Sequence, residues 1–269
     1  MSLPSLAHHV RLLLLLVSLS SGACGVSAQI KGAVIYELRN ADTRELRTNP
    51  QYIVRFSGGV SLETIHQPAT VKVIETFDQE SNRSLTNQIY RIDKPYFILK
   101  DVESDQLALS SRVSVRNFLT QDSLHAFDWQ VHYDTIMDTL GYTCYRATTH
   151  FRGRDYTAWF APDIPLPYGP WKFGGLPGLI FRVYSDDGHL EYSLLEIDFQ
   201  AVFEHDALAV PPEYANDDAI THQDYILLDD RWRDRVSKRS GIEEAGVLDD
   251  GRTTRSTTTI WIPERRELY

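Results

Sequence analysis

Cys144 is the most obvious candidate nucleophile, because it is the only cysteine that follows residue 28. A cysteine nucleophile requires a lowered thiol pKa and a base in contact, and His132 and His150 are the histidines nearest to it in sequence. Cys144 lies, however, in a run with the alternation of a strand, and no recognised Cys–His signature surrounds it. We therefore expect Cys144 to be a small core residue.

Histidines and carboxylates offer two other kinds of chemistry. His132 and Asp134 are two residues apart on a predicted strand, so both could reach one metal ion, with His125 approaching through the intervening loop. Paired carboxylates could serve glycoside hydrolysis, and four lie near one another in sequence: Asp163, Asp186, Asp187 and Glu191. Asp186 and Asp187 already have an explanation as turn residues before Gly188. The sequence contains no zinc-protease, nucleophile-elbow, Walker or dinucleotide-binding signature. We assign no catalytic residue, metal ligand or cofactor.

The most unusual segment covers residues 161–178, which hold five of the 12 prolines and four of the 15 glycines. No regular strand or helix can cross such a segment, yet it also carries three aromatic rings, which a solvated linker would lack. We expect a long ordered loop that either folds back to plug one end of a sheet or faces a ligand. The candidate residues of this motif loop and its approach are Trp159, Pro162, Tyr168, Gly169, Pro170, Trp171, Phe173, Gly174, Gly175, Leu176, Pro177 and Gly178.

The elements that must position this loop are mostly strands. Apolar and polar residues alternate with period two, and β-branched and aromatic residues dominate, over 32–38, 51–56, 70–76, 88–92, 129–133, 143–151, 155–160, 179–184 and 190–197. Turns are predicted at 152–154 and 185–188. This pattern predicts an α+β, β-dominated fold: a large curved antiparallel sheet with few helices, in the form of a half-open barrel.

One helix is predicted late in the chain. Residues 221–224 have the composition of an N-terminal cap, the helix runs to about Arg239, and Gly241 follows as its stop. Its basic residues are best explained as a solvated face balanced by aspartates. Residues 260–262 would add a last edge strand.

Several short stretches around the motif loop resemble one known family. Residues 175–180 spell GLPGLI, and further matches lie at 141–144, Ala147, 156–160, 164–165 and 169–173. Together these resemble the GLPGLI family, also called Porph_ging, of exported proteins from Bacteroidetes-type bacteria, over about residues 125–200. The resemblance implies an envelope location and a β-rich fold. It implies no activity and no catalytic residue.

The N-terminus predicts export. Arg11 precedes the apolar run 12–19, and small residues at 26–28 precede a cleavage point at Gln29. The run is about eight residues long, whereas a spanning helix needs roughly 20. We expect residues 1–28 to be a signal peptide and residues 29–269 to form one domain. A second interpretation uses Cys24 in a box resembling that of lipoproteins, which would anchor the protein to a membrane.

Charge and composition narrow the partners. The formal net charge of −10 disfavours nucleic acid, whose binding requires neutralised phosphates. We expect no transmembrane segment after residue 28. The leading hypothesis is a non-catalytic accessory or binding protein of the periplasm or outer membrane, which binds an apolar ligand, a peptide or an envelope partner. The alternative is an unrecognised hydrolase or a metal-handling periplasmic protein. The sequence identifies neither ligand nor oligomeric state.

Overall fold

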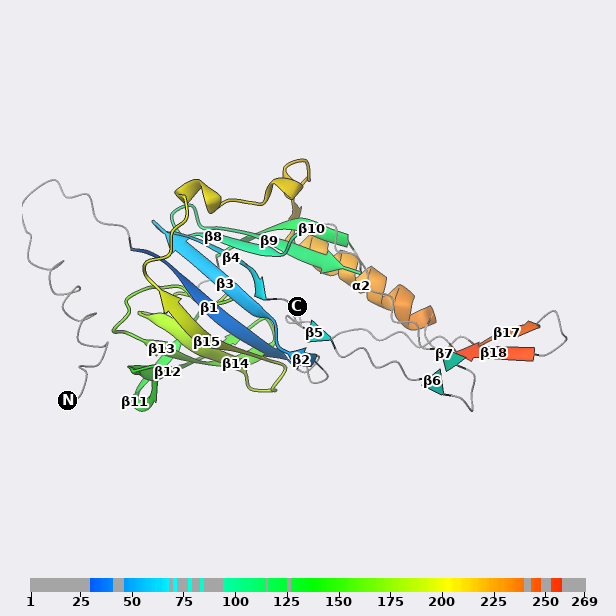
Figure 1. The fold of residues 1–269 in the computed structure, drawn as a ribbon, viewed down its shortest axis with the longest axis horizontal. Coiled ribbons are helices and arrows are strands. Elements are labelled where there is room, and N and C mark those ends of the chain that lie inside the picture. The colour runs from blue at the N-terminus through cyan, green and yellow to red at the C-terminus, as the bar shows by residue number, and fades with distance from the viewer. Residues whose placement is uncertain are drawn as a thin grey trace, which may run out of the picture.

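The computed structural model describes residues 30–40, 46–67, 70–71, 77–78, 83–84, 94–114, 116–124, 127–239, 243–247 and 253–257 (Figure 1). The signal peptide expected over residues 1–28, Cys24, His125 and the strands expected at 88–92 and 260–262 lie outside these ranges. Of the strand expected over 70–76, the two residues Thr70–Val71 form β5.

Twelve strands form one large sheet, in the order β11-β12-β13-β14-β15-β1-β3-β4-β8-β9-β10-β16. Every pairing in it is antiparallel except that of β16 with β10. The strands are β1 (Lys31–Asn40), β3 (Gln51–Ser57), β4 (Val60–Gln67), β8 (Phe97–Asp101), β9 (Gln106–Val113), β10 (Arg116–Ser123), β11 (Gln130–Thr139), β12 (Tyr142–Phe151), β13 (Arg154–Ala161), β14 (Leu179–Ser185), β15 (Leu190–Asp198) and β16 (Ile220–Thr221). Three short pairs lie outside this sheet: β2 (Leu46–Thr48) with β5, β6 (Phe77–Asp78) with β7 (Arg83–Ser84), and β17 (Glu243–Val247) with β18 (Thr253–Thr257).

The predicted fold class is confirmed: the fold is β-dominated, and the sheet is open, with β11 and β16 as its end strands. Pairing of β1 with β15 joins an N-terminal series of strands to a second series that includes β11–β15. Both predicted turns are confirmed. Positive φ angles of 44° at Arg152 and 82° at Gly153 suit the tight hairpin between β12 and β13, and Gly188 has a φ of 70° in the turn before β15.

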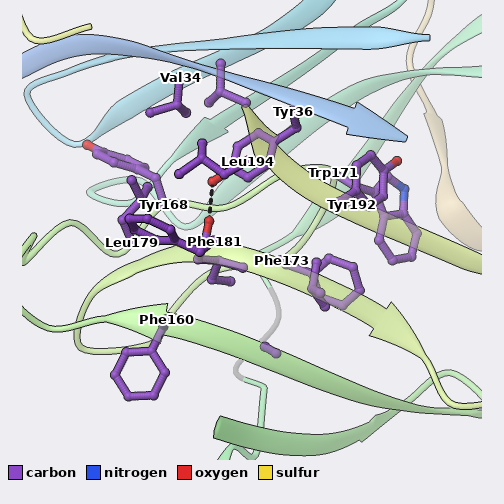
Figure 2. Packing of buried hydrophobic residues seen from close by; sticks show 14 of the residues in the cluster. Val34, Tyr36, Phe160, Tyr168, Trp171, Phe173, Leu179, Phe181, Tyr192 and Leu194 are labelled. Carbon is purple, nitrogen blue, oxygen red and sulfur yellow. Dashed lines mark hydrogen bonds between the residues drawn. The ribbon is translucent and has the colours of Figure 1, made fainter. Parts of the chain in front are cut away.

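The sheet curves, so that β1 and β3 lie opposite β13 and β14 across the main core (Figure 1). The Tyr36 hydroxyl on β1 donates a 2.6 Å hydrogen bond across this core to the Ile180 carbonyl on β14 (Figure 2). Alternate residues of each strand point inward, which buries Val34 and Tyr36 from one side and Val183 and Tyr192 from the other. We call this the inner face of the sheet.

A second, smaller core covers part of the outer face. Residues 203–214, which include the short helices η2 (His205–Ala207) and η3 (Pro212–Tyr214), cross β4, β8 and β9. Tyr214 packs edge-on against Phe97 at 5.0 Å and donates a hydrogen bond to the Pro95 carbonyl at 2.8 Å. Residues 203–214 therefore cover the outer face of these strands.

The late helix is confirmed as α2 (His222–Arg239). Thr221 and Asp224 form a reciprocal cap, since the Thr221 hydroxyl accepts from the Asp224 amide at 3.1 Å and the Asp224 carboxylate accepts from Thr221. Two basic residues of the helix pair with aspartates one turn away, Arg233 with Asp229 and Lys238 with Asp234. Among the helices of the described ranges, none has both the length and the apolar character needed to cross a bilayer.

Candidate functional site

The motif loop, residues 162–178, runs from β13 to β14 and lies inside the curve of the sheet. The expected packing of its rings is confirmed, because Trp171 is 4% exposed and Phe173 fully buried (Figure 2). Phe173 sits among several rings, with centroids 5.0 Å from Tyr156 on β13 and 5.5 Å from Phe127 in the segment before β11. Of the candidate residues in the loop, the buried ones are Tyr168, Gly169, Pro170, Trp171, Phe173, Leu176 and Gly178; Pro162 and Gly174 are half-buried; Gly175 and Pro177 are exposed.

The loop backbone turns sharply within this core. Tyr168 and Gly174 form an isolated β-bridge, and Gly175 has a φ of 81°, which glycine tolerates best. A side chain at Gly178 would collide with the Ala161 carbonyl. Trp171 itself has a φ of 49°, a conformation that costs energy for a bulky residue and persists only where the surroundings enforce it. The loop must therefore be held by strong contacts.

The first of these contacts is a buried pair of charges from neighbouring strands. Glu63 on β4 and Lys100 on β8 are 1% and 6% exposed. The Trp171 amide donates to the Glu63 carboxylate at 2.6 Å, and Lys100 Nζ donates to the carbonyls of Gly169 and Phe173 at 2.9 and 2.8 Å. Tyr96 adds a 2.6 Å bond to Glu63. Burial lowers the pKa of Lys100 to about 8, against the opposing effect of the Glu63 charge.

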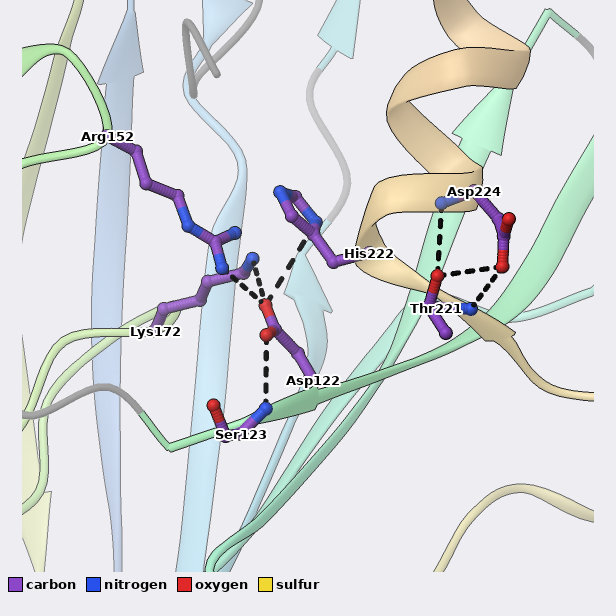
Figure 3. A network of polar contacts seen from close by, with 7 residues as sticks. All are labelled: Asp122, Ser123, Arg152, Lys172, Thr221, His222 and Asp224. Carbon is purple, nitrogen blue, oxygen red and sulfur yellow. Dashed lines mark hydrogen bonds and ion pairs between the residues drawn. The ribbon is translucent and has the colours of Figure 1, made fainter.

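The second contact is centred on Asp122, at the end of β10 (Figure 3). Its carboxylate accepts from Lys172 in the loop at 3.1 Å and from Arg152 in the β12–β13 turn at 2.9 Å. His222, the first residue of α2, lies 4.0 Å from the same oxygen. Lys172 is almost fully buried, so it is held by this ion pair and not by solvent. The cluster connects β10, the hairpin turn, the loop and α2.

These two clusters were not identified from the sequence. Glu63, Lys100 and Asp122 are single charges within strand-like runs, and each looks like an ordinary exposed residue of an alternating strand. Glu63 and Lys100 stand out as buried charges only when the strand register is known, because the register places both on the inner face. The register itself depends on contacts between distant parts of the chain.

Trp159 differs from the other candidate residues. It lies on β13, between the buried Ala158 and Phe160, and is half-buried. Strand alternation places it on the outer face, where part of its side chain packs against the main core. Trp159 therefore lies on the opposite face of β13 from the motif loop.

Cys144 is fully buried in the main core, as expected from the sequence. Burial, with a smaller effect of the Asp138 charge, raises the pKa of its thiol to about 12, so the thiol is protonated at neutral pH. The two histidines considered as bases have other partners: His132 lies 3.1 Å from the Thr148 hydroxyl, and His150 lies 2.7 Å from Asp155.

The carboxylates considered for hydrolysis have separate partners. Asp187 pairs with Arg154, Glu191 pairs with Arg182 at 2.9 Å, and Asp186 accepts from the Thr157 hydroxyl at 3.0 Å. Burial alone would raise the pKa values of Asp187 and Glu191, but hydrogen bonds and arginines outweigh it and lower both. Neither is suited to act as a general acid at neutral pH.

In the part of the chain that the structure describes, no three His, Cys, Asp or Glu side chains are placed to hold one metal ion. The register of β11 against β12 shifts between His132 and Ile136. The regular alternation that would put His132 and Asp134 on one face is therefore interrupted at that point.

Comparisons with known proteins give a partial match. No curated protein matches the sequence. The fold is similar to two crystal structures of PNGF-II, in two space groups, each with a TM-score of 0.47 and 12% identity; they cover 76% and 77% of this chain and 34% of that chain. The present chain thus spans about a third of the length of PNGF-II. Residues 152–182, which include the motif loop, match the model of a family described as "Protein of unknown function (Porph_ging)". This match supports the assignment of the chain to the Porph_ging family.

Proposed function

We propose that this chain is an exported, non-catalytic accessory or binding protein of the cell envelope. The observation that carries the proposal is that the buried charged side chains near the motif loop are bound by other parts of the fold. Glu63, Lys100 and Lys172 bind the loop backbone or Asp122, which leaves them unsuited to act on a substrate. On this proposal the family motif is a structural device that fixes the sheet.

The same proposal places binding on the outside of the sheet. Side chains of the motif loop fill the inner face, so a ligand there would have to displace Trp171 and Phe173. The outer face is more open: a groove of about 250 Å³ lies between β1, β3 and residues 201–203, with Ile35, Ile53 and Phe203 among its lining residues. An apolar ligand, a peptide or an envelope partner would bind on this side.

Export and origin belong to the same proposal. We infer that residues 1–28 are removed, that the protein lies in the periplasm or at the outer membrane, and that it is a GLPGLI protein of a Bacteroidetes-type bacterium. N-terminal sequencing of protein from its own cells should find Gln29 as the first residue. A lipid-modified Cys24 would contradict that start and place the protein on a membrane.

Native mass spectrometry of protein isolated from its own envelope tests the function. The proposal predicts a discrete bound ligand or partner that is released unchanged on unfolding. A chemically altered ligand, or turnover of the released ligand when it is returned to the purified protein, would contradict a non-catalytic role and favour the hydrolase alternative.

A further inference from the structure

A single row of side chains crosses the outer face of six neighbouring strands. Strand register aligns one residue from each of six neighbouring strands, β11, β12, β13, β14, β15 and β1. The row consists of His132, Arg146, Trp159, Arg182, Ser193 and Glu37. Directly opposed residues on antiparallel strands have Cβ atoms about 4.5–5.5 Å apart, so adjacent members of the row are neighbours.

The exposure pattern places this row toward solvent. All six residues are half-buried, whereas the flanking residues on the three central strands, such as Ala158, Val183 and Tyr192, are fully buried. The residues 203–214 that cover the outer face elsewhere pack over β4 and β8 instead. The row is therefore a shallow polar strip with one indole ring at its centre.

Charge pairing within the row is uneven. Arg182 is paired with Glu191 at 2.9 Å, and Glu37 is paired with Arg39 at 2.9 Å. Arg146 and the Trp159 indole N–H have no hydrogen-bond or ion-pair partner among the described residues. A cation without a partner beside a half-exposed aromatic ring is thus the chemically available part of the strip.

We propose that the Trp159–Arg146 pair binds an acidic oligosaccharide, with one sugar ring stacked on the indole and a sugar carboxylate held by the guanidinium. Arginine presents a planar set of donors that matches a carboxylate in a bidentate manner. The indole offers an apolar face to the ring C–H groups and one N–H to a hydroxyl. Ser193 and Glu37 extend the strip with groups that hydrogen-bond further hydroxyls.

The polar character of the strip decides against other ligands. A lipid chain would desolvate Arg146 without offering its guanidinium a partner, at a high cost. Nucleic acid carries a phosphate at every nucleotide and needs several cations in sequence, whereas this strip has one unpaired arginine, which suits a single sugar carboxylate. This inference rests on the proposed role as a binding protein and goes beyond it, because it adds a saccharide site apart from the groove between β1 and β3.

The test is calorimetric titration of the purified protein with three acidic probes: a galacturonate hexamer, a hyaluronan hexasaccharide and sialyllactose. Maltohexaose is the neutral counterpart. The proposal predicts that at least one acidic probe binds, that maltohexaose binds at least about tenfold more weakly, and that added salt weakens only the acidic probe. Failure of all three acidic probes, or equal binding of maltohexaose, would overturn it.

Variants locate the site. Trp159→Ala and Arg146→Gln should each weaken binding by about tenfold or more, whereas Trp159→Tyr should retain most of it. Arg116→Gln is the matched control, because Arg116 is an exposed arginine of β10 in the other half of the sheet. Unchanged binding in Trp159→Ala, or an equal loss in Arg116→Gln, would contradict the site.

The outcomes separate this inference from the proposed function. A partner found by native mass spectrometry, together with no binding of any acidic probe, would remove the saccharide site and leave the accessory role intact. Cleavage of a bound probe would instead contradict the non-catalytic role, while the location of the site would still be judged by the variants.

Discussion

The inner and outer faces of the sheet use similar residues in opposite ways. On the inner face, Trp171 lies beside Glu63, and its backbone amide donates a hydrogen bond to the Glu63 carboxylate. Lys172 lies beside Asp122 and forms an ion pair with it. On the outer face, Trp159 lies beside Arg146, and neither has a polar partner in the described part of the chain. A tryptophan and a charge therefore stabilise the fold in one setting and are available for binding in the other.

This contrast predicts unequal effects of substitution. Changes on the inner face should lower the free energy of unfolding, because each removes one member of a buried network. Changes on the outer face should weaken ligand binding and lower stability by much less.

Glu63→Leu should have the largest effect. It leaves the Trp171 amide and the Tyr96 hydroxyl without their acceptor and removes the charge opposite Lys100. Removing one member of a buried charged pair costs about 3–5 kcal/mol of unfolding free energy, measurable by urea denaturation. Glu103→Leu, in an exposed turn, is the control and should change stability by less than about 0.5 kcal/mol. Equal effects of the two variants would contradict the role given to Glu63.

Lys100 should make stability depend on pH. Its pKa is lowered from 10.5 to about 8 in the folded protein, so between these values the folded state binds fewer protons than the unfolded state. The contribution of Lys100 to stability therefore increases as pH rises from about 8, by up to about 1.4 kcal/mol per pH unit. Cys144 acts in the opposite direction above pH 9, because burial raises its thiol pKa.

The measurement is the difference in unfolding free energy between wild type and Lys100→Met at pH 7.5 and at pH 9. The unfolding free energy of the wild type should rise relative to that of the variant over this interval. Cys144 is present in both proteins, so its titration does not change the difference. A constant difference would show that Lys100 keeps its ordinary pKa on folding.

Cys144→Ser should have a smaller effect. Placing a hydroxyl in this buried site should cost at most about 1–2 kcal/mol, and the function in cells should persist. Thermal melting and a cellular assay at matched protein levels test both parts. Loss of function in a variant that is folded and equally abundant would show that the thiol itself is required.

Sequence alone predicted the fold best where burial and alternation coincide. Strands β12 to β15 match their predicted ranges to within one residue at each end, and α2 has a polar cap in Thr221 and Asp224. Strands β4 and β8 were not singled out individually. Both contain a buried charge, Glu63 or Lys100, that interrupts the apolar face by which an inward-facing strand is recognised.

The candidate site was predicted in part, for a related reason. Composition alone indicated that Trp171 and Phe173 would be packed. The partners that hold the loop are far away in sequence: Glu63 is 108 residues from Trp171, and Lys100 is 69 from Gly169. No local pattern connects such residues, and the separation of Trp159 from the loop likewise appears only when strand register is known.

The most direct test compares Trp171→Ala with Trp159→Ala in one experiment, by urea denaturation and by titration with the acidic probe that binds wild type best. Trp171→Ala should lose about 3–5 kcal/mol of unfolding free energy and, where it remains folded, bind normally. Trp159→Ala should lose less, about 2 kcal/mol or below because its ring is only half-buried, and bind about tenfold or more weakly. The reverse pattern, in which Trp171→Ala is stable and fails to bind, would show that the motif loop faces the ligand and would contradict the account.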